Sequence, residues 1–281
     1  MNPVKLFLIL FVVASAWFPF TRPIAFGDEL NFAIIQPGQP GSPKEAQPVM
    51  DALAAYLQKK MGTDCAVKGV YFNELDPALA FLHNEPPTWG IVRLGFYAEH
   101  ARAFQMTALA STRPGGHDTD IWRLVVSTDG PGDWKALKGT VLGNMLFEKD
   151  AASCLLFDLP SNRLPFTLKG TFRPLSSLRR VIRGKVAGVV LDRSQYEAAQ
   201  ALPLMQNIAV VHTSQKIPAS PVIWFGKTDN RTRELTRILL QMKEDRDAQT
   251  LLKLLQTDGF GPADPDLPRF RRGENGAACF P

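Results

Sequence analysis

Residues 30–62 read LNFAIIQPGQPGSPKEAQPVMDALAAYLQKKMG, and this stretch decides the fold class. Its opening run, Leu30 to Ile35, is apolar and predicts a buried strand. A loop rich in proline and glycine, 36–43, breaks that strand. From Ala46 to Met61 the apolar residues recur at helical spacing, which predicts an amphipathic helix. A strand followed directly by a helix indicates one unit of an α/β fold.

The same alternation continues along the chain in two successive α/β units. Further strands are expected over 65–70, 90–92, 122–127, 140–142, 171–173, 187–191, 208–212 and 222–226. Further helices are expected over 76–83, 150–157, 176–183, 194–201 and 232–255. Strands that alternate with helices imply parallel sheets with helical cover, so the sequence predicts an α/β protein.

The composition excludes several classes of protein. Of 281 residues, 45% are hydrophobic, 21% charged and 10% aromatic, which is ordinary for a globular protein and rules out disorder, collagen-like repeats and coiled coil. The 32 Lys and Arg residues against 27 Asp and Glu residues give a net charge of +5. This mild excess lacks the dense positive field of a nucleic-acid binder, so no nucleic-acid partner is expected, whereas an anionic small ligand is compatible with it.

The first 25 residues have the layout of a secretory signal peptide. Lys5 is followed by the apolar run Leu6 to Val13 and then by small residues, so cleavage could follow Ala16 or Ala25, and the later site is favoured. An uncleaved membrane anchor is disfavoured because the apolar stretch is short and Pro19 interrupts it. We therefore expect export to the periplasm.

No catalytic motif stands out in the sequence. The three cysteines, Cys65, Cys154 and Cys279, allow at most one disulfide, and the sequence does not choose the pair. Cys154 near a helix start could act as a nucleophile with His212 as its base, but a buried cysteine on an apolar face explains it better. The four histidines have no metal-ligand spacing. The expectation is that the protein is not an enzyme, with no catalytic residue, no metal and no cofactor.

Several short motifs, in this order and spacing, resemble the phosphate/phosphonate-binding branch of the type 2 periplasmic solute-binding proteins, the substrate-binding components of ABC transporters. The similar stretches are Ile34–Pro37, Ala55–Gly62, Val70–Phe72, Leu94–Tyr97, Trp134–Gly143 and Gly184–Asp192. The family's Ser/Thr-rich turn, which opens a helix at the ligand, is replaced here by Gly143–Ala151, with Glu148 and Asp150. The resemblance therefore comes with a divergent ligand-binding turn.

The resemblance implies a two-lobed fold in which each lobe is a sheet flanked by helices and the ligand cleft lies between the lobes. Lobe 1 would comprise 29–115 plus 217–257, lobe 2 would comprise 116–216, and 258–281 would be an irregular C-terminal tail. It further implies a monomer that closes on a small oxyanionic ligand by a hinge motion and presents it to a membrane permease or sensor protein. The alternative is a sensing or protein-interaction module that no longer serves transport.

Candidate ligand-binding residues are those that follow strands, because ligands of two-lobed α/β proteins bind at the carboxyl ends of strands. Arg93 is the best group for pairing an anion, although a structural ion pair explains it equally well. Asp192 is either a ligand contact or the cap of the next helix. The full candidate set is Gln36, Tyr71, Phe72, Arg93, Tyr97, Asn144, Asp192, Arg193 and Ser220.

Overall fold

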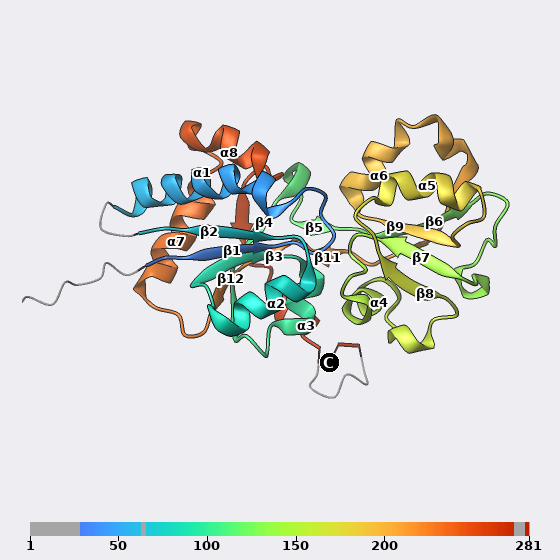
Figure 1. Cartoon of the computed structure of the whole chain (residues 1–281), viewed down its shortest axis with the longest axis horizontal. Helices are drawn as coiled ribbons and strands as arrows, with labels where there is room; N and C mark the ends of the chain where they lie inside the picture. The colour runs from blue at the N-terminus through green and yellow to red at the C-terminus, as the bar shows by residue number, and fades with distance from the viewer. Residues whose placement is uncertain (1–28, 63–65, 273–278, 281) are drawn as a thin grey trace, which may run out of the picture.

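The structure is a computed structural model, in which residues 29–62, 66–272 and 279–280 are described. Figure 1 shows two bodies side by side, each built on a sheet, with the C-terminal end of the chain between them. The expected signal peptide, residues 1–25, lies outside the described residues. Within the described ranges, no helix is long and apolar enough to cross a bilayer.

The first body, lobe 1, contains a six-stranded sheet in the order β13-β4-β12-β3-β1-β2. β1 is parallel to β2 and β3, and β12 is antiparallel to β3 and β4. Because parallel neighbours need a crossover, helices join these strands. The strands are β1 (Phe32–Ile35), β2 (Gly69–Phe72), β3 (Trp89–Val92), β4 (Met106–Thr112), β12 (Pro221–Phe225) and β13 (Phe260–Pro262).

Helices cover both faces of this sheet. α1 begins where the Ser42 side chain accepts a hydrogen bond from the Glu45 backbone N–H and Pro43 occupies the first turn. α1, α7 and α8 pack on one face, and α2 and α3 pack on the other (Figure 1). The helices are α1 (Pro43–Met61), α2 (Leu75–Asn84), α3 (Leu94–His100), α7 (Asn230–Gln241) and α8 (Gln249–Leu254).

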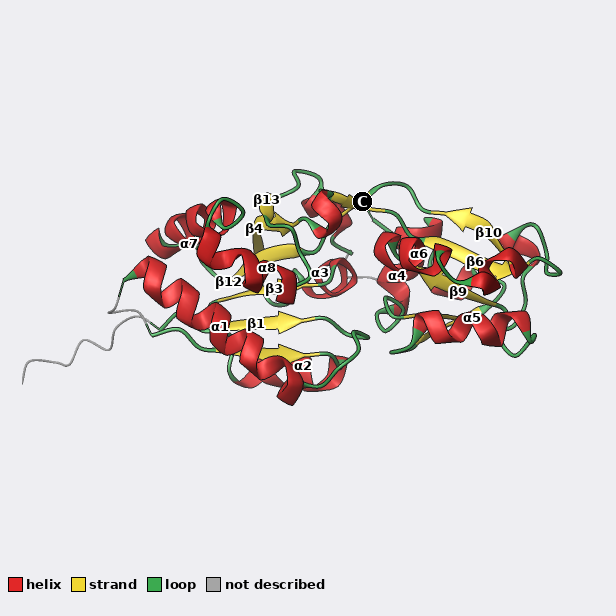
Figure 2. Cartoon of the chain, turned by 90° about the horizontal axis from the view of Figure 1, so that it is seen from above, coloured by secondary structure: helices red, strands yellow, loops and turns green. Residues whose placement is uncertain are grey.

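The second body, lobe 2, contains a five-stranded sheet in the order β10-β6-β9-β7-β8. Its central strand β9 is fully buried, and α5 and α6 cover the face seen from above in Figure 2, while α4 covers the opposite face. The strands are β6 (Arg123–Ser127), β7 (Thr140–Gly143), β8 (Thr167–Gly170), β9 (Gly188–Leu191) and β10 (Ile208–Thr213). The helices are α4 (Lys149–Phe157), α5 (Pro174–Ile182) and α6 (Arg193–Gln200).

The two lobes are joined by more than the chain crossings. The chain passes between them at β5 (Thr119–Asp120) and β11 (Ile217–Pro218), which pair with each other. One cluster of buried apolar side chains also continues from lobe 1 into lobe 2, from Phe96 in α3 to Leu155 in α4. α3 and α4 thus pack against each other at the boundary between the lobes.

The two-lobed α/β architecture confirms the predicted fold class, and three local predictions were wrong. The strand expected over 171–173 lies earlier, at β8, because its pairing with β7 ends at Gly170 and Pro174 then begins α5. The helical region over 232–255 is two helices, since Asp245 caps a new 3-10 turn after α7. The tail expected to be irregular contains β13, which hydrogen-bonds to β4 and extends the lobe 1 sheet.

Candidate ligand-binding site

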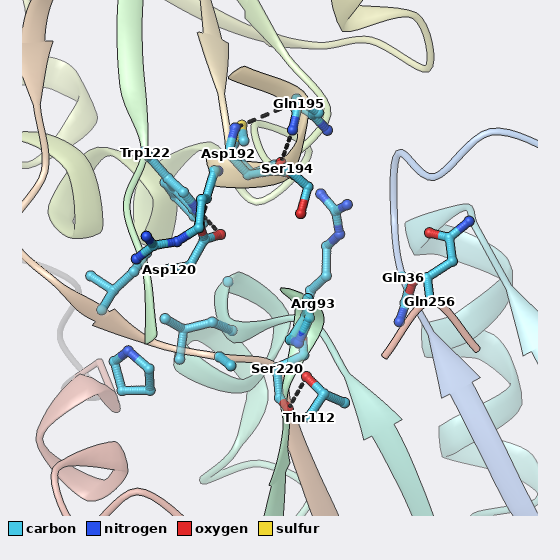
Figure 3. Close-up of a pocket in the computed structure, with 18 of the residues that line it drawn as sticks. Gln36, Arg93, Thr112, Asp120, Trp122, Asp192, Ser194, Gln195, Ser220 and Gln256 are labelled. Atoms are coloured by element: carbon cyan, nitrogen blue, oxygen red, sulfur yellow. Dashed lines mark hydrogen bonds between the residues drawn. The ribbon is translucent and has the colours of Figure 1, made fainter. Parts of the chain in front are cut away.

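A cavity of about 300 Å³ lies between the two lobes, at the carboxyl ends of β1, β3 and β9 (Figure 3). Both lobes and both crossings line it, as expected for the cleft of a two-lobed α/β protein. Of the nine candidate residues, the structure brings five together here: Gln36, Arg93, Asp192, Arg193 and Ser220. The cavity is large enough for a small organic solute.

Arg93 extends from lobe 1 into this cavity. Its backbone N–H donates to the carbonyl of Ile35, which fixes the chain directly after the buried strand β3. In Figure 3 its guanidinium points toward Ser194 and Gln195 of lobe 2. Burial lowers the pKa of Arg93, and the nearby carboxylates of Asp192 and Glu148 partly oppose this shift. An arginine remains charged in proteins, so a cation is held inside the cavity.

The Arg93 guanidinium contributes no polar contact to the described part of the structure. Among the described residues it forms no hydrogen bond and no ion pair within 4.0 Å. Arg93 is half-buried, and a charge withdrawn from water without a partner is costly, whereas a planar guanidinium suits an anion with two acceptor oxygens. Among the described residues Arg93 thus forms no structural ion pair within 4.0 Å, and pairing with an anion stays a prediction.

Glu148 reaches the same cavity from lobe 2, where it precedes α4. Its side chain is 5% exposed, and neither carboxyl oxygen has a hydrogen-bond partner in the described part of the chain. Burial raises the pKa of Glu148 to about 7, and Arg93 acts in the opposite direction. Glu148 can thus carry a proton near neutral pH and donate a hydrogen bond to an anion beside Arg93.

Glu148 was not among the sequence candidates. The sequence marks it only as an acidic residue in the divergent turn at the start of a lobe 2 helix, where the similar family has a Ser/Thr-rich turn. What the sequence does not give is its burial, since part of that burial comes from Gly95 of the other lobe.

Asp192 and Arg193 are held by local contacts of lobe 2. Asp192 caps α6, where its Oδ1 accepts a hydrogen bond of 2.8 Å from the Gln195 backbone N–H. Burial and the neighbouring Asp120 raise the pKa of Asp192 to about 6. The Arg193 backbone N–H donates to Asp120 Oδ1 at 3.0 Å, and its guanidinium donates to the Thr119 carbonyl. The capping interpretation of Asp192 therefore holds, and its carboxyl still lines the cavity.

Gln36 and Ser220 line the cavity from lobe 1 and from the return crossing. The Gln36 backbone N–H donates to the Phe72 carbonyl at 2.8 Å, which ties the end of β1 to β2. The Ser220 carbonyl accepts hydrogen bonds from the backbone and the hydroxyl of Thr112. Both positions are thus fixed through their backbone, which leaves the side chains available to a ligand (Figure 3).

The other four candidates lie outside this cavity. Tyr97 is fully buried, and its hydroxyl accepts a hydrogen bond from Arg271 Nε at 2.8 Å. Phe72 packs on Phe81. Asn144 is buried between the lobes, with its Nδ2 3.5 Å from Gln39 Oε1. Tyr71 lines a second cavity adjoining the first.

Two chemical possibilities raised by the sequence, a metal site and a cysteine nucleophile, can be compared with the structure. Within the residues that the structure describes, no group of three or more His, Cys, Asp or Glu side chains could hold a metal ion. Cys154 forms a disulfide with Cys279, and His212 Nε2 lies 2.6 Å from the Leu156 carbonyl oxygen. Cys154 therefore has no free thiol that could act as a nucleophile with His212 as its base.

The raised pKa of Glu148 predicts a loss of stability with increasing pH. Between pH 4.5 and about 7 the folded state keeps a proton that the unfolded state has released, so the free energy of unfolding falls as pH rises through this window. The ionised Glu148 then costs about 3 kcal/mol at pH 8. We expect Glu148→Gln to exceed the wild type by roughly this amount at pH 8 and to differ little at pH 5.

Urea unfolding at the two pH values measures the difference. Glu197→Gln, which changes an exposed glutamate on α6, is the matched control and should follow the wild type at both pH values. Parallel pH profiles for the wild type and Glu148→Gln would show that Glu148 is ionised in the folded state throughout.

Two α/β lobes on either side of a cavity are the architecture of the two-lobed periplasmic binding proteins. Residues 158–267 match the family model described as "ABC transporter, phosphonate, periplasmic substrate-binding protein". The predicted resemblance to the phosphonate branch of the type 2 periplasmic solute-binding proteins is thereby confirmed, and its known members capture a solute for an ABC transporter. Comparison with curated protein sequences gives no match.

Solved structures share the fold at low sequence identity. The chloride-bound structure of XAC2383 from Xanthomonas citri is 17% identical, with a TM-score of 0.67 over 86% of this chain and 94% of that chain. A binding protein component of an ABC phosphonate transporter from Pseudomonas aeruginosa, PA3383, is 14% identical, with a TM-score of 0.61 over 85% and 83%. PhnD1 from Prochlorococcus marinus, in complex with methylphosphonate, is 13% identical, with a TM-score of 0.58 over 86% and 94%.

Proposed function

We propose that this chain is an exported solute-binding protein that captures a small anionic solute between its lobes and presents it to an ABC-type permease. The observation that carries the proposal is the guanidinium of Arg93, which enters the interlobe cavity and has no partner among the described residues. A half-buried cation without a partner is a preformed counterion for a ligand, since a bound anion offsets the cost of withdrawing the charge from water.

The other charged side chains that line the cavity limit how much negative charge a ligand can carry. Asp120, Asp192 and Glu148 stand against Arg93 and Arg193, so a ligand with a large negative charge would meet repulsion. Glu148 relieves part of this repulsion when it is protonated and supplies a hydrogen-bond donor. We therefore propose a ligand with one compact anionic group of low charge, such as a singly ionised phosphonate or a sulfonate. We expect this ligand to bind more tightly at pH 6 than at pH 8.

Delivery to a permease requires that the lobes open and close. We propose that the hinge lies at the two crossings, Thr119–Asp120 and Ile217–Pro218, because they connect the lobes beside the cavity. The ligand would stabilise the closed state by contacting both lobes at once, through Arg93 on one side and the turn before α4 on the other.

A binding screen tests the proposed function. Purified protein is titrated at pH 6 with phosphate, methylphosphonate, methanesulfonate and sulfate, by isothermal calorimetry and by thermal unfolding. We expect one molecule bound per chain for at least one of these anions, with a rise in the unfolding temperature that grows with concentration. If none binds at millimolar concentration, the capture of an anion is refuted, and a sensing or interaction role is favoured.

A further inference from the structure

One stretch of lobe 2 carries a dense run of positive charge. Residues 159–191 contain seven Lys and Arg residues and no Asp or Glu, so this stretch alone exceeds the net charge of +5 of the whole chain. Six of the seven belong to β8, to α5 and to the turn after α5, and all six are exposed: Lys169, Arg173, Arg179, Arg180, Arg183 and Lys185. We refer to these six residues as the basic face.

The basic face lies on one side of lobe 2, where Figure 1 shows α5 on the outside of the lobe, above its sheet. α5 packs on the sheet through its apolar side chains. At about 100° per residue, Arg179, Arg180 and Arg183 fall within an arc of roughly 100° on the opposite side of the helix. Lys169 pairs with Leu142 of β7, whose side chain packs in the cluster under α5, so Lys169 projects from the same face of the sheet. The remaining two residues flank α5 at its two ends.

The charges of the basic face do not stabilise the fold. Within the described part of the chain, none of the six charged groups forms a hydrogen bond or an ion pair within 4.0 Å. The helix dipole favours arginines in the last turn of α5 but disfavours Arg173, which precedes a first turn without an acidic residue. Arg179 and Arg183 are four residues apart, a spacing at which like charges destabilise a helix. The cluster therefore costs stability and presents its charge to solvent.

An exposed aromatic side chain adjoins the basic face. Phe172, directly before Arg173, is 37% exposed, one of three large apolar side chains so exposed among the described residues. Its ring packs on Phe147 with a centroid distance of 4.9 Å, which holds it beside the N-terminal end of α5. Cations next to an exposed aromatic are typical of surfaces that lie on a membrane. There the cations attract anionic head groups, and the apolar side chain enters the boundary with the acyl chains.

We propose that the basic face docks lobe 2 on the surface of an anionic lipid bilayer. Six like charges without an intervening carboxylate suit a surface of many anionic head groups, because such a surface attracts cations without requiring a partner at each position. None of the six residues lines the cavity between the lobes, so docking leaves that cavity free and does not depend on a captured solute. For an exported binding protein, docking of this kind keeps the chain near the bilayer in which a permease lies.

Cosedimentation with lipid vesicles tests the proposal. The purified protein is mixed with vesicles of phosphatidylcholine alone or of phosphatidylcholine with phosphatidylglycerol, at low and at high sodium chloride. We expect binding to the anionic vesicles to be about 10-fold stronger or more at low salt, and this preference to fall at high salt because salt screens the attraction. Equal binding to both kinds of vesicle would overturn the lipid surface as the partner and favour an acidic protein in its place.

Two triple variants with the same change in net charge locate the docking surface. Arg179→Gln/Arg180→Gln/Arg183→Gln removes half of the basic face and should weaken binding to the anionic vesicles roughly 100-fold. The control changes three exposed arginines of lobe 1 and should stay within about threefold of the wild type: Arg233→Gln/Arg237→Gln/Arg246→Gln. All variants share one N-terminal segment, so its contribution cancels, and thermal unfolding checks that each is folded. An equal loss in both triple variants, or no loss in the first, would overturn the proposal.

Discussion

Arg93→Gln is expected to weaken anion binding by about 100-fold or more. The variant keeps a polar side chain of related shape and removes the only cation that points into the cavity without a partner among the described residues. It also removes the positive field that lowers the pKa of Glu148, so that Glu148 becomes harder to ionise. The folded state should persist, because the Arg93 guanidinium contributes no hydrogen bond to it.

Calorimetry with methylphosphonate at pH 6 measures this loss. Arg163→Gln makes the same charge change at an exposed position of lobe 2 and should bind as the wild type does. Arg93→Lys should fall between the two, since an ammonium retains the charge but cannot donate two parallel hydrogen bonds. An affinity for Arg93→Gln within threefold of the wild type would mean that the anion binds elsewhere.

The sequence predicted part of this site because that part depends on local order. Arg93 and Gln36 each follow a buried strand directly, and parallel strands bring their carboxyl ends to one edge of the sheet. Tyr97 follows the same strand as Arg93 but lies one helical turn further, on the face of α3 that packs into the core. Its neighbour Arg271 is 174 residues away along the chain, a contact that no local pattern indicates.

The limits of the sequence are clearest where two lobes meet. Asn144 follows β7 just as Arg93 follows β3, yet it is buried because Gly38 of lobe 1 approaches it. Gly38 has a φ of 85°, and a side chain there would overlap the Asn144 carbonyl oxygen and the Phe147 ring. Such contacts depend on how the lobes dock, which strand and helix periodicity does not determine.

The C-terminal tail is the part of the fold that differs most from expectation. After β13, Arg271 donates to the Met106 carbonyl of lobe 1, and Arg272 pairs with Glu99 of α3 at 2.7 Å. The next described residue, Cys279, is bonded to Cys154 of α4 in lobe 2. The tail therefore links the two lobes beside the contact between α3 and α4, and the pair of cysteines that the sequence left open is settled.

Removing this disulfide is expected to lower the free energy of unfolding by about 4 to 5 kcal/mol. The cross-link joins residues 125 positions apart, so it excludes a large set of extended conformations from the unfolded chain. Both cysteines are buried, at 2% and 8% exposure, and their replacement by alanine adds a smaller packing loss. The denaturant dependence should steepen at the same time, because the unfolded chain without the cross-link exposes more surface.

Guanidinium unfolding of Cys154→Ala, Cys279→Ala and the double variant measures this contribution. Each single variant should lose nearly as much as the double variant, because either change removes the whole bond and the effects of bonded partners are not additive. Wild type treated with dithiothreitol should show the same loss, and unchanged stability after reduction would refute the prediction. A disulfide of this kind persists in an oxidising compartment, so a large dependence on it would also support the proposed export to the periplasm.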